Sequence, residues 1–133
     1  MNYKSVGKLV YQEDPERCFV EVSQQLADYY LYLLKREGYL VQPTKYKPHI
    51  TVIRYRVERV SPLLSKQELR SCASMFGEVE FDYDHKIRQS GERLVLDAWS
   101  DDVGNFRVSI GLPRYRVGFD RYHITVGRSK MAD

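Results

Sequence analysis

Two short segments of this sequence carry the same run of residues around a histidine. Residues 47–54 read KPHITVIR, and residues 121–128 read RYHITVGR. In both, a basic residue stands two positions before the histidine, His-Ile-Thr-Val follows, and an arginine stands five positions after the histidine. Histidine changes its charge near neutral pH and can both accept and donate a proton. The repeat therefore indicates acid–base chemistry by His49 and His123.

The spacing within each segment suits a β-strand. Successive side chains of a strand point to opposite faces, so residues two apart share a face. The residues that share a face are Lys47, His49 and Thr51 in the first segment and Arg121, His123 and Thr125 in the second. The isoleucine and valine of each segment point the other way and are expected to be buried. In a regular strand Arg54 and Arg128 would also lie on that aliphatic side, so we rank Lys47 and Arg121 above them as phosphate contacts.

Two such strands placed side by side predict a phosphate site. One neutral imidazole would remove a proton from an attacking hydroxyl, and the other, protonated, would donate one to the leaving oxygen. The hydroxyls of Thr51 and Thr125 would donate hydrogen bonds to phosphate oxygens as charge develops. We therefore predict His49, Thr51, His123 and Thr125 as catalytic residues that need no metal or cofactor. The alternative is that both histidines are ordinary strand residues, which leaves the repeated tetrapeptide unexplained.

The paired His-x-Thr motifs resemble those of the two-histidine (2H) phosphoesterase superfamily. The resemblance implies a fold of two pseudo-symmetric α+β lobes with antiparallel sheets around a central groove and helices on the outer faces. It implies a phosphoesterase, with 2′,3′-cyclic phosphodiesterases and 2′–5′ RNA ligase-like enzymes among its members. The segments SQQLADYYLYLL, LDAWSDD and GLPRYR further resemble phage anti-CBASS nucleases of this superfamily. These hydrolyse cyclic di- and oligonucleotide immune signals at 3′–5′ linkages without metal.

Three functions thus remain open for this chain. The preferred one is hydrolysis of a cyclic oligonucleotide signal, which in a virus would serve evasion of host immune signalling. The competitor is a 2′,3′-cyclic phosphodiesterase acting on RNA ends, and a third alternative is a non-catalytic nucleotide- or RNA-binding module. Tyr11 and Tyr115 are the aromatic residues we favour for stacking on a base, with simple packing as the alternative for both.

Composition favours one cytoplasmic domain that binds an anion. A chain of 133 residues fits a single domain, 1–133, with lobes of roughly 1–60 and 61–133. It contains no apolar run of the roughly 20 residues that a membrane helix needs, and no signal-peptide pattern. We therefore expect a location in the cytoplasm, which would be the host's if a phage encodes the protein. We expect a nucleotide or short cyclic oligonucleotide as ligand, no membrane contact and no obligatory protein partner.

Hydrophobic patterning predicts the elements that would position the two motifs. Strands are expected at residues 5–12, 17–22, 49–57, 78–88, 92–99 and 122–128. Helices are expected from Ser23 to about residue 37, from the capping box Ser65–Glu68 to Gly77, and from Ser100 to about Ile110. The net charge of +3 is small, but basic residues gather around both motifs, which favours an anionic ligand.

Overall fold

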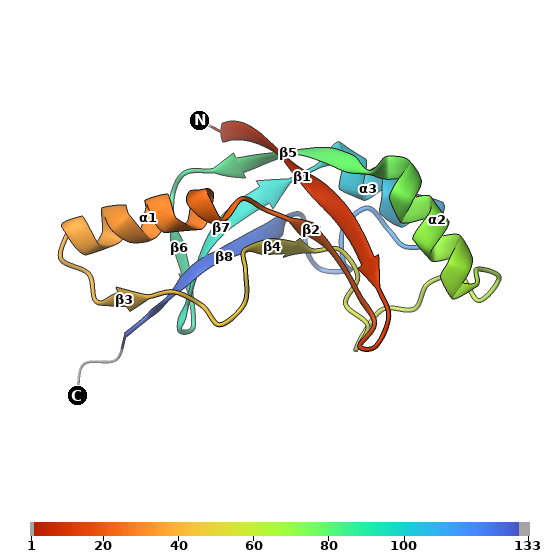
Figure 1. The fold of residues 1–133 in the computed structure, drawn as a ribbon, viewed down its shortest axis with the longest axis horizontal. Coiled ribbons are helices and arrows are strands. Elements are labelled where there is room, and N and C mark those ends of the chain that lie inside the picture. The colour runs from red at the N-terminus through yellow and green to blue at the C-terminus, as the bar shows by residue number, and fades with distance from the viewer. Residues whose placement is uncertain (1, 131–133) are drawn as a thin grey trace.

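All the strands belong to one antiparallel sheet in the computed structural model, which describes residues 2–130 (Figure 1). The strands are β1 (Asn2–Gln12), β2 (Arg17–Glu21), β3 (Val41–Gln42), β4 (His49–Thr51), β5 (Glu78–Asp84), β6 (Arg88–Ser90), β7 (Arg93–Trp99) and β8 (Tyr122–Ser129). Their order is β3-β8-β4-β2-β1-β5-β7-β6, and β7 also pairs with β8. Six strands therefore close into an antiparallel barrel, with β3 and β6 attached to it.

The helices lie at two ends of the molecule (Figure 1). They are α1 (Gln24–Arg36), α2 (Lys66–Phe76) and α3 (Asp101–Ser109). Helix α1 packs on β8 and β3, whereas α2 contacts β1 and α3 contacts β5. The predicted α+β class is confirmed. The finer arrangement, two pseudo-symmetric lobes with their own sheets, stays a prediction.

The helix ends follow local chemistry that was readable in the sequence. The predicted capping box is confirmed: the Ser65 hydroxyl accepts from the Glu68 N–H at 3.1 Å, and the Ser65 N–H donates to the Glu68 carboxylate at 3.2 Å. The Ser100 hydroxyl caps α3 by accepting from the Val103 N–H. Ser23 precedes α1, but its side chain makes no capping hydrogen bond.

Two predicted strands are shorter than expected. The strand predicted over 49–57 is wrong beyond Thr51, because β4 ends there and the chain turns at residues 55–57. The strand predicted over 78–88 ends at Asp84, and a separate short strand, β6, begins at Arg88. Both differences arise where β-branched or alternating residues continue past the point at which a strand partner is available.

A buried ion pair fixes the chain just after β4. Arg107 of α3 is 2% exposed and donates to both carboxylate oxygens of Glu58, and also to the carbonyl oxygens of Val52 and Pro113. Burial alone would raise the pKa of Glu58, but its hydrogen bonds with Arg107 and with the Arg54 N–H hold that pKa below the usual range. The carboxylate thus holds the Arg54 backbone in place, close to the first motif.

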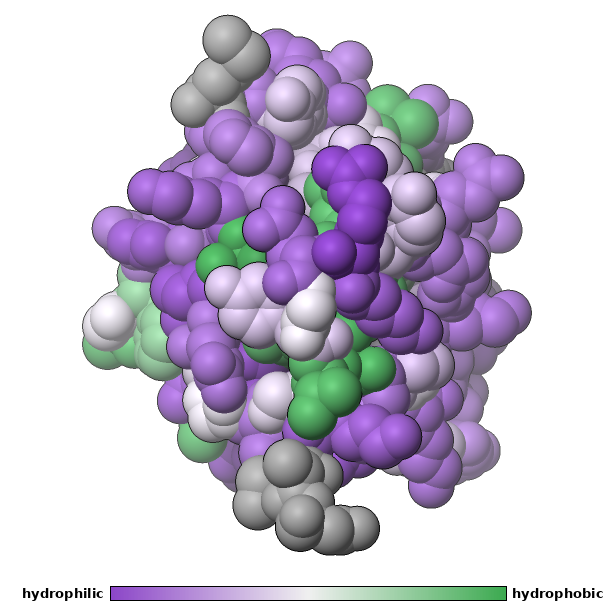
Figure 2. All heavy atoms as spheres, turned by 90° about the vertical axis from the view of Figure 1, so that its left-hand side faces the viewer, coloured by the Kyte–Doolittle hydropathy of each residue, from purple (hydrophilic) through white to green (hydrophobic). Residues whose placement is uncertain are grey.

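One end of the molecule has a mostly polar surface. Figure 2 shows the end of the molecule at which α1 stops, where hydrophilic residues cover most of the face and apolar ones form small separate groups. Among the exposed large apolar residues of the molecule are Tyr39 and Leu40, in the loop between α1 and β3. Single exposed apolar residues of this kind are normal on a folded protein. Within residues 2–130, no helix is long and apolar enough to cross a membrane.

Candidate functional site

Strands β4 and β8 bring the two motifs together. The strands are antiparallel neighbours, and Ile50 pairs with Ile124. This register sets His49 opposite Thr125 and Thr51 opposite His123, where directly opposed Cβ atoms lie about 4.5–5.5 Å apart. Both isoleucines are 0% exposed, whereas the histidines and threonines are partly exposed. The predicted division of each motif into a polar face and a buried face is therefore confirmed.

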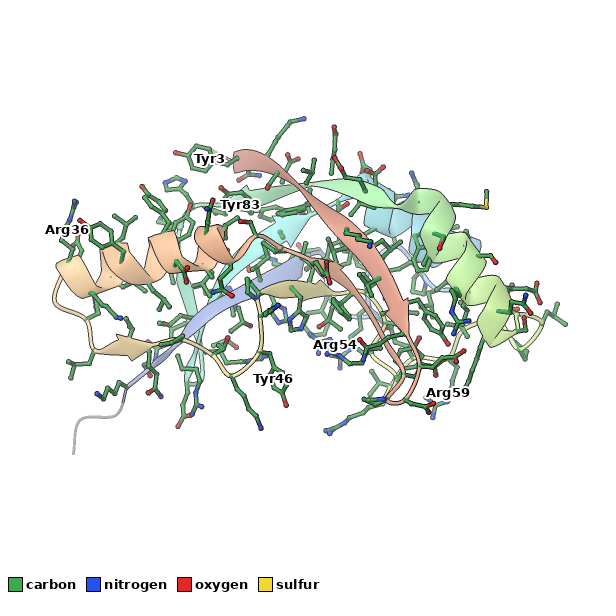
Figure 3. The ribbon with its side chains drawn as sticks, viewed as in Figure 1. Tyr3, Arg36, Tyr46, Arg54, Arg59 and Tyr83 are labelled. Atoms are coloured by element: carbon green, nitrogen blue, oxygen red, sulfur yellow. The ribbon has the colours of Figure 1, made fainter. Side chains whose placement is uncertain are left out.

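The polar face of the motifs forms the floor of a cavity of about 440 Å³. Its lining residues are Thr44, Lys45, Tyr46, Lys47, His49, Thr51, Arg54, Arg93, His123, Thr125 and Arg128. All four predicted catalytic residues are among them. Tyr46 and Arg54, from the chain on either side of β4, lie on the same side of the sheet (Figure 3). We call this space the histidine cavity; its lining side chains include no carboxylate.

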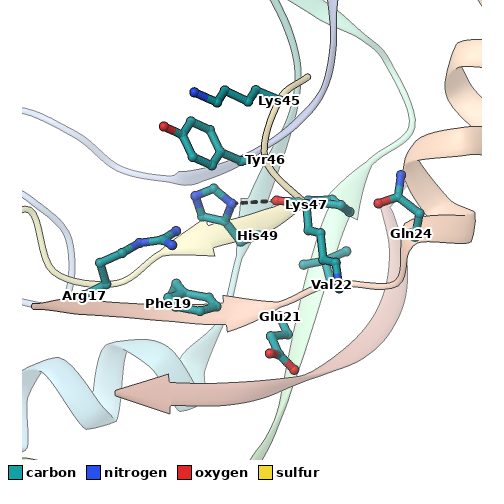
Figure 4. Close-up of a pocket in the computed structure, with 10 residues that line it drawn as sticks. Arg17, Phe19, Glu21, Val22, Gln24, Lys45, Tyr46, Lys47 and His49 are labelled. Carbon is teal, nitrogen blue, oxygen red and sulfur yellow. Dashed lines mark hydrogen bonds between the residues drawn. The ribbon is translucent and has the colours of Figure 1, made fainter. Parts of the chain in front are cut away.

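A backbone hydrogen bond orients the His49 ring. The Nδ1–H of His49 donates to the carbonyl oxygen of Lys47 at 2.9 Å (Figure 4). Because a carbonyl oxygen can only accept, Nδ1 carries the proton and Nε2 is left to exchange protons with a ligand. Phe19 packs against the ring in a T-shaped contact, with centroids 5.8 Å apart. His49 is thus held in one orientation by its own strand and by β2.

His123 is partly buried and is surrounded by positive charges. Burial and the nearby positive charges of Arg54, Arg93 and Arg88 lower its pKa from 6.5 to about 4. All of these disfavour the imidazolium. At neutral pH the His123 ring of the free protein is therefore uncharged and able to accept a proton.

The effect of the Arg54 charge on the pKa of His123 can be tested by titration. The His123 ring should take up its proton near pH 4, well below the ordinary histidine value of 6.5, in a pH series followed by NMR. Arg54→Gln removes a positive charge beside the imidazolium, so it should raise the midpoint, whereas Arg54→Lys keeps the charge and should leave it low. A midpoint near 6.5 in the unaltered protein, or the same midpoint in Arg54→Gln, contradicts this assignment.

The arginine that follows each motif lines the histidine cavity rather than lying on the aliphatic side, as regular alternation predicts. After Thr51 the strand ends, and both Val52 and Ile53 are buried, at 1% and 3% exposure. This loss of alternation turns Arg54 back to the side of the histidine. Arg54 lines the cavity, and no carboxylate lies within ion-pair distance of its guanidinium among residues 2–130.

Arg128 reaches the same cavity by a related irregularity. Leu94 of β7 pairs with Gly127, while the next residue, Val95, pairs with Thr125, so β8 has one extra residue at this point. Such a bulge shifts the alternation of side chains by one position. Arg128 therefore lies on the face of Thr125 and lines the cavity, where it also pairs with the exposed Glu92 at 3.2 Å.

The two cations that we ranked first have different surroundings. Lys47 is exposed and lines the histidine cavity, and it also supplies the carbonyl that orients His49. Arg121 does not line this cavity but lines an adjoining one, together with His123. Its guanidinium already pairs with Asp97 at 3.0 Å and with Asp120 at 2.8 Å. Arg54 is thus better placed than Arg121 to contact a phosphate between the histidines.

The two tyrosines predicted to stack on a base lie outside the histidine cavity. Tyr11 is 9% exposed, and its hydroxyl donates to Glu16 in the turn after β1. Tyr115 packs against Tyr122, with ring centroids 4.9 Å apart. Neither residue lines that cavity or the adjoining one described next, so the structure favours the alternative of simple packing for both.

Other aromatic residues occupy the position that we assigned to these tyrosines. A second cavity of about 780 Å³ adjoins the first at His49, Tyr46 and the neighbouring lysines. Phe19 and Tyr46 lie on either side of His49 in Figure 4. Arg17 stacks over Phe19 at 4.6 Å from the ring centroid. Tyr46 stands only three residues before His49, but Phe19 is brought there by the pairing of β2 with β4, which the sequence alone does not specify.

Comparisons with protein-family models, with curated proteins and with solved structures find no match to this chain. The resemblance of the two motifs to the 2H phosphoesterases therefore stays a prediction. Among the residues that the structure describes, no three His, Cys, Asp or Glu side chains group as metal ligands would. The site offers two imidazoles, of which that of His49 is oriented by a backbone hydrogen bond, two hydroxyls and several cations, and its function has to be argued from these groups.

Proposed function

We propose that this chain is a phosphodiesterase that acts on nucleotides by acid–base catalysis with His49 and His123. One observation carries the proposal: the antiparallel register of β4 and β8 sets each histidine opposite the threonine of the other motif. The cavity above these four side chains is lined by cations and no carboxylate. Such a site suits a phosphate that lies between the two histidines, with the attacking oxygen on one side of the phosphorus and the leaving oxygen on the other.

The surroundings of the two histidines support different roles. His123 is uncharged at neutral pH because burial and nearby arginines lower its pKa to about 4, so we assign it as the base. His49 keeps its Nδ1–H on the Lys47 carbonyl, which leaves Nε2 for the ligand, so we assign His49 as the acid, which in its protonated form would donate from Nε2 to the leaving oxygen. A bound phosphate offsets the arginine charges around His123 and makes the ring a stronger base once substrate is present.

The remaining groups of the cavity would stabilise the phosphate. Thr51 and Thr125 each lie across from a histidine, so their hydroxyls can donate to the non-bridging oxygens of the same phosphate. Arg54 offers a guanidinium that no carboxylate pairs with among residues 2–130. Guanidinium groups bind phosphate oxygens through two parallel hydrogen bonds. We therefore add Arg54 to the predicted substrate-binding residues, beside Lys47.

The space around the histidines favours a ligand larger than one nucleotide. The histidine cavity of about 440 Å³ continues into the cavity of about 780 Å³ that holds Phe19 and Tyr46. Partly or fully exposed aromatic rings beside cations suit the bases and phosphates of a single-stranded nucleic acid. A cyclic di- or oligonucleotide, our preferred substrate, would use both cavities. A 2′,3′-cyclic mononucleotide, the competing substrate, would need only the first.

The proposal includes the finer predictions about fold and location. On this view each motif strand belongs to one of two related lobes, with α1 covering one end and α2 and α3 the other. The antiparallel pairing of β4 with β8 through Ile50 and Ile124, at equivalent positions of the two motifs, supports such a pseudo-two-fold relation. The cytoplasmic location and the absence of an obligatory protein partner are parts of the same proposal.

Turnover in the presence of a chelator tests the proposal directly. The protein is incubated in EDTA with cyclic di- and trinucleotides and with 2′,3′-cyclic mononucleotides, and the products are separated by chromatography and identified by mass. Cleavage should persist, because imidazoles, hydroxyls and guanidiniums supply the proton transfers and the charge stabilisation. Activity that disappears in EDTA and returns with added divalent cation would refute the mechanism. Binding without any turnover would favour the non-catalytic module.

A further inference from the structure

A third cavity adjoins the histidine cavity at His123. It has a volume of about 440 Å³, and five arginines line it: Arg54, Arg88, Arg93, Arg116 and Arg121. Asp120 is the one carboxylate in its lining, and it is already paired with Arg121. We call this space the arginine cavity. It shares His123, Arg54 and Arg93 with the histidine cavity, so the two spaces are continuous.

Several of these positive charges lack compensation within the described chain. Asp97 pairs with Arg88 at 2.8 Å and with Arg121 at 3.0 Å. No ion pair joins Arg54, Arg93 or Arg116 to a carboxylate among residues 2–130. Arg116 instead stacks over Phe119, at 4.8 Å from the ring centroid. Three guanidiniums therefore remain available to an anion.

The unpaired arginines of this cavity lie close enough to repel one another, and like charges that lie close together are unfavourable. Burial, Arg116 and Arg93 lower the pKa of Arg54. An anion bound between these side chains would offset the repulsion between their charges. The arrangement therefore suits an anionic ligand.

We propose that the arginine cavity binds a second, non-reacting phosphate of the substrate. Arg116, one of the three arginines without an ion pair, lines this cavity but not the histidine cavity, so an anion that it binds is distinct from the one between the histidines. The inference rests on the proposed function and narrows its substrate. It selects a ligand with at least two phosphates, such as a cyclic di- or oligonucleotide, over a 2′,3′-cyclic mononucleotide.

Binding of two uncleavable nucleotides tests the second phosphate site. Thymidine 3′,5′-bisphosphate and thymidine 3′-monophosphate are titrated into the protein at low salt by calorimetry. Two charge-assisted hydrogen bonds to the added phosphate should make the bisphosphate bind about tenfold tighter or more. Arg116→Gln should remove most of that advantage and leave monophosphate binding unchanged. Arg36→Gln, which removes the same charge from the last turn of α1, should change neither affinity.

The outcomes separate this inference from the proposed function. Neither probe has a 2′-hydroxyl, so the comparison does not depend on turnover. Equal affinities for the two probes, no binding of the bisphosphate, or an equal loss for both probes in Arg116→Gln overturns the second phosphate site. The protein could instead turn over no nucleotide of the EDTA panel and still show a bisphosphate preference that Arg116→Gln abolishes. That result overturns the proposed catalysis but supports the second phosphate site.

Discussion

Replacing either His49 or His123 with alanine should lower turnover by about 10²-fold or more, since each variant loses one of the two proton transfers. Substrate affinity should change little, because Arg54, Lys47 and the threonines remain to hold the phosphate. Steady-state rates and calorimetric binding with an uncleavable nucleotide measure the two effects separately. The threonine variants Thr51→Ala and Thr125→Ala should lose less activity than either histidine variant.

The third histidine provides a matched control. His85 is exposed, lies between β5 and β6, and contacts Asp84 and the ring of Tyr3. It lines neither the histidine cavity nor the arginine cavity. His85→Ala should therefore keep full turnover in the same assay. Near-normal turnover in His49→Ala or His123→Ala, in a variant that is folded by circular dichroism, would refute the assignment.

The pattern of each His-Ile-Thr-Val motif was sufficient to predict on which face of the strand each of its four residues lies. A period of two sends histidine and threonine to one face and the aliphatic residues to the other, and the burial of Ile50 and Ile124 agrees. Helix ends were also predictable where a local capping pattern decides them, as at Ser65. These features depend on residues close in the sequence, so no knowledge of long-range pairing is needed to read them.

The positions of the motif arginines could not be read from the same pattern. Alternation predicts that Arg54 and Arg128 face the core, but β4 ends at Thr51 and β8 carries a bulge after Thr125. A bulge depends on the register with the partner strand β7, which lies far away in the sequence. The location of Tyr11 outside the histidine cavity could not be predicted for the same reason, because the sequence does not say that β2 rather than β1 pairs with β4.

Among changes to the substrate, we expect changes to the 2′-hydroxyl of a cyclic 3′–5′ dinucleotide to have the largest effect on cleavage. Removing it, or methylating it, at the attacked linkage should abolish cleavage and leave binding nearly intact. The reason is that no cysteine, serine or carboxylate lines the histidine cavity, and that its two lysines, Lys45 and Lys47, are exposed to solvent. None of these side chains would act as an activated nucleophile. The ligand's own hydroxyl, deprotonated by His123, is then the attacking group.

The expected products follow from that route. The 2′-oxygen forms a bond to phosphorus, the bond from phosphorus to the 5′-oxygen breaks, and His49 donates its proton to that oxygen. The products are a 2′,3′-cyclic phosphate and a free 5′-hydroxyl, which mass spectrometry distinguishes from the 3′- or 5′-phosphate left by water attack. Rapid hydrolysis of an all-deoxy cyclic dinucleotide would contradict the route and assign the attack to water. Opening of 2′,3′-cyclic mononucleotides alone, with cyclic dinucleotides untouched, would keep the same four motif residues and change only the nucleophile and the ligand.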